Sequence, residues 1–425
     1  MYWLTRFLPD TKLRPTLSWA LFDFANSAYF ILIVSLVFPL YFKEVVAGNE
    51  RGDFYWGLLV GGSVLLSGLI SPLVGALADY DGRRHRKFVI CSLITIGATL
   101  LLYLSGAGRL FITAIIFVTA NLFYELSTVL YDTLLISVSS EITRGRISGL
   151  GWGLGYIGGI VVILVLKPLY GEGYSGELEN LYRLTFPIAA LWFLFFAIPS
   201  FLFIRDKFVA PTSHNWYQII YQVIQRTKRT LSELQTKGSL LWFLVAYFLL
   251  TDALVTIFAF IPLFARSSLG LSIREIVVIF IIVQVVAFPA TILGGWLEDK
   301  FGPRRVVAVS ITGWLIAIAF LLVVSSKLGF YITATLGGLV IGPSQSVVRS
   351  WFSKLIPLER RAEFFGFTAL TGKVSATIAP VLFGAVSSFT GSQRLALLTL
   401  VPFLVVSLII FSRFKTERVE QLATS

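Results

Sequence analysis

The chain has 425 residues, of which 56% are hydrophobic and only 14% are charged, and its formal net charge is +12. Because soluble domains carry about 25% charged residues, this composition excludes a large soluble enzyme and indicates a membrane protein with several spans. Basic residues accumulate in the cytoplasmic loops of such proteins, so the positive charge predicts no nucleic-acid partner.

Residues that commonly bind metals or act in catalysis are scarce. The only cysteine is Cys91, and the two histidines, His85 and His214, fall in predicted loops. These counts exclude an internal disulfide and a cysteine metal cluster, and they disfavour a histidine-based metal site or catalytic triad. The sequence also has no Walker lysine motif for binding ATP. We therefore expect no enzyme activity, no metal and no cofactor.

Twelve segments are apolar over the roughly 20 residues that a membrane helix requires, which predicts an all-α membrane protein. The residues before the first segment lack a signal-peptide cleavage pattern, so we expect that span to be retained. In chain order, the expected spans are 17–43, 54–79, 87–106, 110–137, 147–169, 182–204, 239–264, 273–298, 305–326, 329–352, 363–387 and 392–413.

The connections are short except for segment 205–238, which carries six basic residues. Apolar residues from Trp216 to Ile224 recur there at helical spacing, which predicts an amphipathic helix on the membrane surface. Most lysines and arginines lie on the same side as this segment, so both termini are expected to be cytoplasmic. The predicted domains are a six-helix bundle over 1–204, the linker over 205–238, and a second bundle with a short tail over 239–425. In a bacterium the protein would lie in the inner membrane.

Two short basic turns resemble each other. Gly75 to Lys87 reads G-A-L-A-D-Y-D-G-R-R-H-R-K, and Gly295 to Arg305 reads G-W-L-E-D-K-F-G-P-R-R. Residues 131–149 and 348–366 also correspond at one constant offset, which sets Asp132 against Arg349. Two similar halves with a site at their interface are typical of transporters.

The paired turns and twelve spans resemble the major facilitator superfamily, whose signature turn is G-x-L-a-D-r-x-G-r-r. Three stretches resemble a narrower family, the vacuolar amino-acid effluxer-like family of autophagy-related permeases and bacterial relatives. They read W-A-L-F-D-F-A-N-S-A-Y from Trp19, G-W-G-L-G-Y-I-G-G from Gly151, and E-F-F-G from Glu363 followed by Gly372-Lys373.

The resemblance implies two six-helix pseudo-symmetric bundles in which spans one, four, seven and ten line a central cavity. It also implies alternating access, and export of amino acids or similar zwitterions with protons as the coupling ion.

Six charged residues lie inside the expected spans, where each costs at least about 2.5–3.5 kcal/mol unless it pairs or faces a cavity. They are Asp23, Glu125, Asp132, Asp252, Arg349 and Lys373. Asn121, Glu125, Thr128 and Asp132 share one face of span four, and Gly338, Gly342, Gln345 and Arg349 repeat that spacing in span ten. We expect these two stripes to line a polar path.

Seven residues are predicted to bind substrate or to couple transport: Asp23, Asn26, Asn121, Glu125, Asp252, Gln345 and Lys373. Glu125 is the leading candidate for proton coupling, because it lies nearest the middle of the membrane; the alternative is permanent pairing with Lys373 or Arg349. Lys373 would bind a substrate carboxylate or phosphate, or else pair with Asp23 or Glu125.

Five residues are predicted to act in gating: Asp79, Arg83, Asp132, Asp299 and Arg349. Asp132 and Arg349 would pair as a cytoplasmic gate, unless each is satisfied within its own half. The two turns would hold one conformational state. The high glycine content between Gly149 and Gly159 predicts either close helix packing or a gating role.

Together these features predict a secondary active transporter of a small molecule that works as a monomer in a lipid bilayer. The alternative substrates are a drug, a peptide, a metal chelate or an organic anion. An alternative of another class is a non-transporting membrane receptor on the same fold.

Overall fold

The computed structural model describes residues 13–80, 83–139, 144–169, 177–205, 221, 224–225, 238–355, 372 and 377–414. These residues are helical with short connections and contain no strand. They form two compact units. The first unit draws on Met1–Gly48 and Leu69–Val223, and the second on Asn49–Gly68 and Ile224–Ser425, so that the division runs through a single helix, α4.

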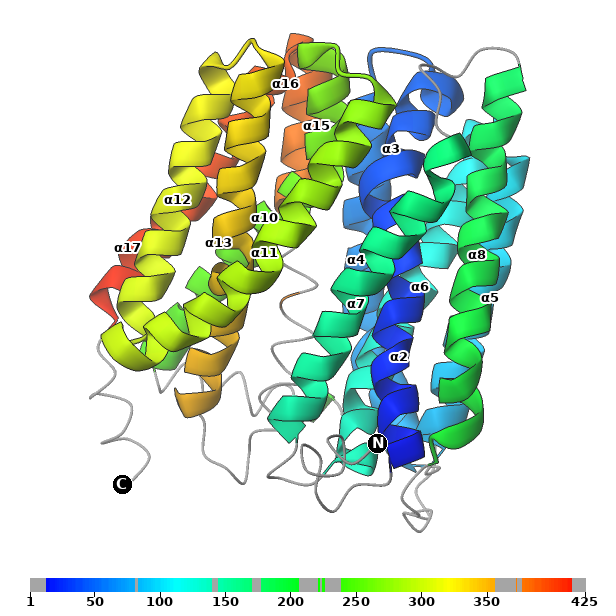
Figure 1. Cartoon of the computed structure of the whole chain (residues 1–425), viewed down its shortest axis with the longest axis vertical. Helices are drawn as coiled ribbons and strands as arrows, with labels where there is room; N and C mark the ends of the chain where they lie inside the picture. The colour runs from blue at the N-terminus through cyan, green and yellow to red at the C-terminus, as the bar shows by residue number, and fades with distance from the viewer. Residues whose placement is uncertain are drawn as a thin grey trace. The chain divides into compact units, whose positions relative to one another are not determined.

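The first unit begins with one long apolar rod. It comprises α2 (Leu13–Tyr29), the π-helix η1 (Phe30–Leu36), α3 (Val37–Tyr41) and a second π-helix, η2 (Phe42–Ala47). In a π-helical turn the backbone hydrogen bonds join residues five positions apart, and such turns frequently occur at functional sites. The other elements are the later part of α4 (Gly52–Tyr80), α5 (Arg84–Leu101), η3 (Leu102–Leu104), α6 (Leu110–Val138), α7 (Arg144–Leu166), η4 (Lys167–Leu169) and α8 (Glu177–Phe203). Helix α2 packs on α7 and α8, and α5 packs on α6 (Figure 1).

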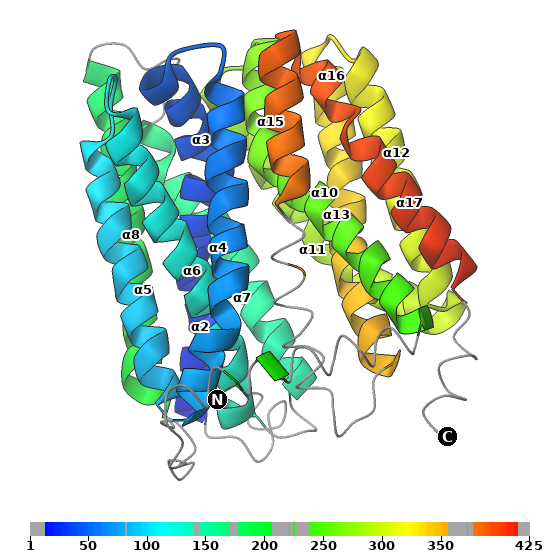
Figure 2. The same ribbon diagram turned by 180° about the vertical axis from the view of Figure 1, so that it is seen from behind.

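The second unit contains the helices of the second half of the chain. They are α10 (Gly238–Leu269), α11 (Ile273–Phe301), α12 (Pro303–Val323), α13 (Lys327–Leu355), α15 (Ile378–Thr390), α16 (Gln393–Leu397) and α17 (Leu400–Arg413). Helix α13 packs on both α11 and α12, and α17 packs on α10 and α12 (Figure 2). The start of α11 is fixed by a capping box, in which Ser272 and Glu275 each bond to the other's backbone N–H.

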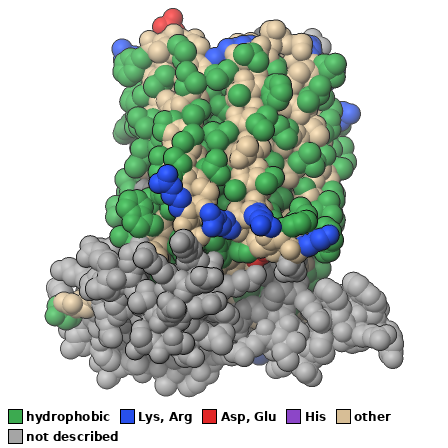
Figure 3. Space-filling view, turned by 90° about the vertical axis from the view of Figure 1, so that its left-hand side faces the viewer, with side chains coloured by type: hydrophobic (Ala, Val, Ile, Leu, Met, Phe, Trp, Pro, Cys, Tyr) green, Lys and Arg blue, Asp and Glu red, His purple; other side chains and the backbone are tan. Residues whose placement is uncertain are grey.

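Within the described residues, ten helices are long and apolar enough to cross a membrane, and they coincide with expected spans one to nine and twelve. Helix α13 runs through the expected tenth span without interruption. Helix α15 forms the end of the eleventh, most of which lies outside the described residues. On the face shown in Figure 3, hydrophobic side chains are spread over the described surface, and a row of lysines and arginines lies just above the atoms that are not described, with others at the upper edge. The prediction of an all-α membrane protein is confirmed.

The second of the two basic turns shows why its glycine is required. Helix α11 ends at Phe301 and α12 begins at Pro303, and between them Gly302 has a φ of 81°. That backbone conformation favours glycine, and proline is well suited to the first position of the next helix. In the first turn, Gly82 lies outside the described residues. There the Lys87 ammonium donates to the Leu77 carbonyl at 3.2 Å, near the end of α4.

Candidate functional site

In the first unit, α2 and α6 are joined by a reciprocal contact between Trp19 and Tyr131. The Trp19 indole N–H donates to the Tyr131 carbonyl at 3.0 Å, and the two rings stack with centroids 4.3 Å apart. The Tyr131 hydroxyl donates to Oδ2 of Asp23 at 2.9 Å and also lies 3.0 Å from the Trp19 carbonyl. A half-buried carboxylate is thereby held at a fixed position on α2.

Glycines of α7 make room for this carboxylate. A Cβ added at Gly151 would overlap Oδ2 of Asp23, and one at Gly155 would lie 3.5 Å from the Asp23 Cβ. A Cβ at Gly158 would lie 2.5 Å from the Phe24 carbonyl oxygen. The three glycines recur at helical spacing along the face of α7 that meets α2. Close helix packing, one of the two roles predicted for this glycine-rich segment, is therefore observed at these positions.

The polar stripe of α6 is present and runs from a buried end to an exposed end. Asn121 is buried, and its Oδ1 lies 3.4 Å from the Tyr29 hydroxyl, which is a long hydrogen bond. Glu125 is half-buried and Asp132 is exposed. Asn26 of α2 is also buried. These residues share one face because α6 is continuous from Leu110 to Val138, and that this face lines a polar path stays a prediction.

Carboxylates from α2 and α6 surround the same pair of tyrosines. Asp23, Glu125 and Asp132 all interact electrostatically with Tyr124, and Asp23 and Asp132 do so with Tyr131. The three carboxylates therefore lie in one region of the first unit and make it acidic. No group of three metal-ligating side chains occurs anywhere in the described part of the chain. An acidic region of this kind suits an organic cation or a proton.

In the second unit, Asp252 of α10 is bound to the start of another helix. Its side chain is 1% exposed, and the backbone N–H of Ala379 lies 3.2 Å from Oδ1 and 3.1 Å from Oδ2. Ala379 belongs to the first turn of α15, where backbone N–H groups lack partners within the helix and the helix dipole favours an anion. Asp252 therefore caps α15 from a neighbouring helix.

The four residues of the stripe predicted on α13 do not share one environment. Gln345 and Arg349 are exposed, and Arg349 interacts electrostatically with Tyr247 of α10. Gly338 and Gly342 instead pack against α11, because a Cβ at Gly342 would overlap Thr291 and one at Gly338 would lie 3.1 Å from the Val283 carbonyl. The expectation that these two glycines line a polar path is wrong. Equal spacing along a helix does not ensure that one face meets one environment along its whole length.

Several predicted residues cannot be placed. Lys373 and most of the linker 205–238 lie outside the described residues, and so do the side chains of Asp79 and Asp299. Arg83, at the first turn, is exposed. Asp132 and Arg349 belong to different units, so their pairing stays a prediction.

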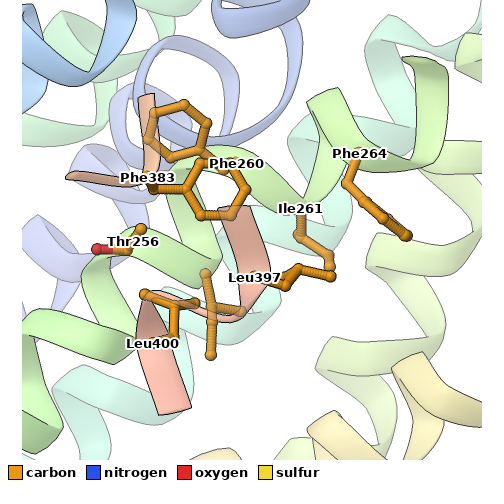
Figure 4. Close-up of a pocket in the computed structure, with 8 residues that line it drawn as sticks. Thr256, Phe260, Ile261, Phe264, Phe383, Leu397 and Leu400 are labelled. Carbon is orange, nitrogen blue, oxygen red and sulfur yellow. The ribbon is translucent and has the colours of Figure 1, made fainter. Parts of the chain in front are cut away.

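An apolar cavity in the second unit does not suit a polar solute. Its volume is about 10 Å³ and it lies among α10, α15, α16 and α17, lined by Thr256, Ile257, Phe260, Ile261, Phe264, Phe383, Leu397 and Leu400 (Figure 4). That volume is at the limit for one water molecule. We therefore treat it as a packing defect.

The structure buries two acids that the sequence did not single out, Asp53 and Glu298. Asp53, in the first turn of α4, is 3% exposed and accepts hydrogen bonds from Ser387 and Gln393. A charge at the expected start of a span is ordinarily solvated, so its position gave no signal. The sequence signal that could have found this contact is the pair Gly57 and Gly61, because small residues four positions apart on a helix allow a close helix contact.

Comparison with protein families gives one match over most of the chain. The family model described as "Vacuole effluxer Atg22 like" matches residues 136–423.

Individual relatives agree with this match. The chain is 27% identical over 403 residues to the uncharacterized MFS-type transporter YxiO of Bacillus subtilis (strain 168), with 93% of each chain covered. It is 28% identical over 321 residues to autophagy-related protein 22 of Coccidioides immitis (strain RS), covering 68% of this chain and 52% of that relative.

A solved structure shows the same fold. The crystal structure of a D-xylose-proton symporter superposes with a TM-score of 0.72 at 15% sequence identity, covering 96% of this chain and 98% of the other. The chain therefore shares the fold of major facilitator transporters.

Proposed function

The chain belongs to the vacuole effluxer Atg22-like family and is a membrane transporter of the major facilitator type, and on that premise we propose that it exports a small zwitterion in exchange for protons. Amino acids are the substrate class that fits best. The proposed cycle is alternating access, in which the substrate path opens to one side of the membrane at a time.

The acidic region of the first unit carries this proposal. Asp23, Glu125 and Asp132 lie there together on α2 and α6. A zwitterion has an ammonium for these carboxylates, and we assign its carboxylate to Lys373, as the sequence predicts. A neutral sugar would leave these charges unused.

Proton coupling is assigned to Glu125 first and to Asp23 second. Glu125 is half-buried within α6. In the proposed cycle it takes up and releases one proton in each turn. Asp23 already accepts the Tyr131 hydroxyl, which holds its side chain in place and makes it the less suitable of the two. Glu125 therefore remains the group whose loss of charge should uncouple transport.

The orientation and gating are part of the same proposal. The excess of basic residues on one set of loops supports a cytoplasmic location of both termini. Asp132 and Arg349 would pair at that side when the path is open to the outside, and the turns that contain Asp79, Arg83 and Asp299 would hold the closed arrangement.

Reconstituted protein tests this function directly. Purified protein in liposomes should accumulate at least one labelled amino acid when the interior is acidic, because protons leaving would drive the substrate inward. The opposite gradient should not drive accumulation. Glu125→Gln should abolish gradient-driven accumulation while it retains exchange of labelled for unlabelled substrate. The exposed Glu44→Gln serves as the matched control and should leave both activities unchanged.

Two results would contradict the proposal. Accumulation driven only by an alkaline interior would indicate symport in place of exchange. Absence of flux for every member of a broad amino-acid panel would exclude this substrate class.

A further inference from the structure

One face of α11 is exposed along the second half of the helix and changes in character toward its end. Phe288, Ile292, Trp296 and Lys300 are all exposed and lie four residues apart, which places them on one side of the helix. The order toward the end of α11 is therefore apolar, then aromatic, then basic. One leaflet of a membrane has the same order, from the acyl chains through the interface to the phosphate of the headgroup.

The ammonium of Lys300 is held beside aromatic rings. Its Nζ lies 5.0 Å from the ring centroid of Trp296 and 5.4 Å from that of Phe301, and both are cation–π contacts. Both rings are exposed. Because tryptophan is enriched where membrane and water meet, this end of α11 has the composition expected at the level of the headgroups.

The same order recurs on two neighbouring helices. On α12 the exposed Arg305 lies one turn from the exposed Val309, and on α17 the exposed Arg413 lies one turn from the exposed Ile409. Helix α12 packs on both α11 and α17, and the basic ends of the three helices lie at one edge of the second unit (Figure 1). Arg304 is exposed there as well. We call Lys300, Arg304, Arg305 and Arg413 the basic edge.

None of the four residues of the basic edge forms an ion pair with an acidic side chain among the described residues. Glu298 is close in sequence, but it is buried and accepts a hydrogen bond from Ser350 of α13 at 2.9 Å. Arg304 and Arg305 lie in the first turn of α12, which contains no acid, and the positive end of a helix dipole disfavours cations. An anion bound at this edge would offset both effects.

A phospholipid with a net negative headgroup fits both features of this surface. A free phosphate ion would leave the exposed apolar faces of the three helices without a partner. A zwitterionic headgroup would bring a cation of its own to a surface that is already basic. In an acidic phospholipid no such cation balances the phosphate, and the acyl chains are apolar.

We propose that the basic edge binds the phosphate of an acidic phospholipid, whose acyl chains lie along the exposed faces of α11, α12 and α17. The guanidinium groups of Arg304 and Arg305 bind the phosphate oxygens through paired hydrogen bonds, and Lys300 and Arg413 add charge on either side. In the proposed orientation this edge faces the cytoplasm, where the membrane surface carries acidic lipids. The site requires no statement about the transported substrate or about protons.

Lipid binding to the purified full-length protein tests the proposal. Delipidated protein in a neutral detergent is titrated with phosphatidylglycerol or with phosphatidylcholine that has the same acyl chains. Inorganic phosphate is the third titrant, because it has the charge but no chains. Native mass spectrometry measures the number and affinity of bound lipids, and the unfolding temperature measures the stabilisation that binding produces.

Two paired substitutions separate charge from packing. Arg304→Gln with Arg305→Gln removes two charges, whereas Arg304→Lys with Arg305→Lys keeps them. The matched control is Arg51→Gln with Lys167→Gln, which removes two exposed charges from other loops.

We expect the parent to bind phosphatidylglycerol several-fold more tightly than phosphatidylcholine. The glutamine pair should weaken phosphatidylglycerol binding by about tenfold or more, because two cations that attract the acidic headgroup are lost. The lysine pair should retain most of the affinity, and the control pair should bind like the parent. Inorganic phosphate should stabilise none of these proteins to the extent that phosphatidylglycerol stabilises the parent.

Equal affinity of the parent for the two lipids would overturn the proposal, and so would parental binding of phosphatidylglycerol in the glutamine pair. An equal loss in the control pair would indicate a general effect of net charge, and full stabilisation by inorganic phosphate would indicate a site for a free anion. If the glutamine pair does not fold, Lys300→Gln with Arg413→Gln takes its place, with the same loss expected. No substrate or gradient enters the assay, so selective lipid binding without amino-acid transport would contradict the proposed function alone.

Discussion

Tyr131 donates its hydroxyl to the Asp23 carboxylate across 2.9 Å, and so links the fourth expected span to the first. The indole ring of Trp19 stacks on the Tyr131 ring and holds the tyrosine in place. This arrangement fixes one of the three carboxylates that we assign to the substrate path.

Removing the Tyr131 hydroxyl should lower both stability and transport. Tyr131→Phe removes this donor from a half-buried carboxylate, which should cost about 1–3 kcal/mol. Thermal unfolding in detergent measures the stability, and flux in liposomes measures the activity. Tyr103→Phe is the matched control, since the contacts of Tyr103 involve its ring and its carbonyl. A Tyr131→Phe protein as stable and as active as the parent would contradict the anchoring role.

Alanine at Gly151 should destabilise the protein, although alanine ordinarily stabilises a helix relative to glycine by about 1 kcal/mol. The new Cβ would overlap Oδ2 of Asp23. The control is Gly97→Ala on α5, where no heavy atom lies within 4 Å of the added Cβ. We therefore expect opposite signs for the change in unfolding temperature at the two positions. A gain at both would mean that α7 is not held tightly against α2.

Substitutions of Asp252 should separate its capping role from its charge. Asp252→Ala removes the acceptor for the Ala379 N–H, and loss of a cap costs about 0.5–2 kcal/mol. Asp252→Asn keeps an acceptor and should be milder. Hydrogen exchange at the first turn of α15 should accelerate in the alanine variant more than in the asparagine variant. If both variants retain parental exchange but lose transport, Asp252 acts on the substrate path and not on the helix.

Exchanging the charges of Asp132 and Arg349 tests the proposed gate. Each single reversal, Asp132→Arg or Arg349→Asp, places like charges together and should lower transport by about tenfold, equivalent to about 1.4 kcal/mol. The double variant restores an opposite pair and should recover most of the flux. A double variant no better than the weaker single one would show that the two residues do not meet during the cycle.

Much of the fold was predictable from the sequence. Apolar length located the spans, and the spacing of Asn121, Glu125 and Asp132 predicted one polar face on α6. Gly302 and the capping residues Ser272 and Glu275 act locally, so their effect depends on neighbours within a few positions. Such features need no knowledge of distant contacts.

The contacts between helices were not predictable in the same way. In a membrane protein, helix faces toward lipid and toward the interior are both apolar, so hydrophobic periodicity does not tell which neighbour a face meets. Gly338 and Gly342 share a face with Arg349, yet they pack against α11. Asp252 has the sequence pattern of a substrate-binding acid, and its observed partner is a backbone N–H more than 120 residues away.

The sequence by itself determined that this protein is an all-α membrane protein with several spans and a repeated basic turn, because composition and repeated turns are properties of the chain alone. Only the tertiary structure decided which charges are buried against which partners. It placed Asp23 under Tyr131, Asp252 at the start of α15, and Asp53 between Ser387 and Gln393. The cost of burying a charge depends on the groups within a few ångströms of it, and residues far apart in the sequence supply most of those groups.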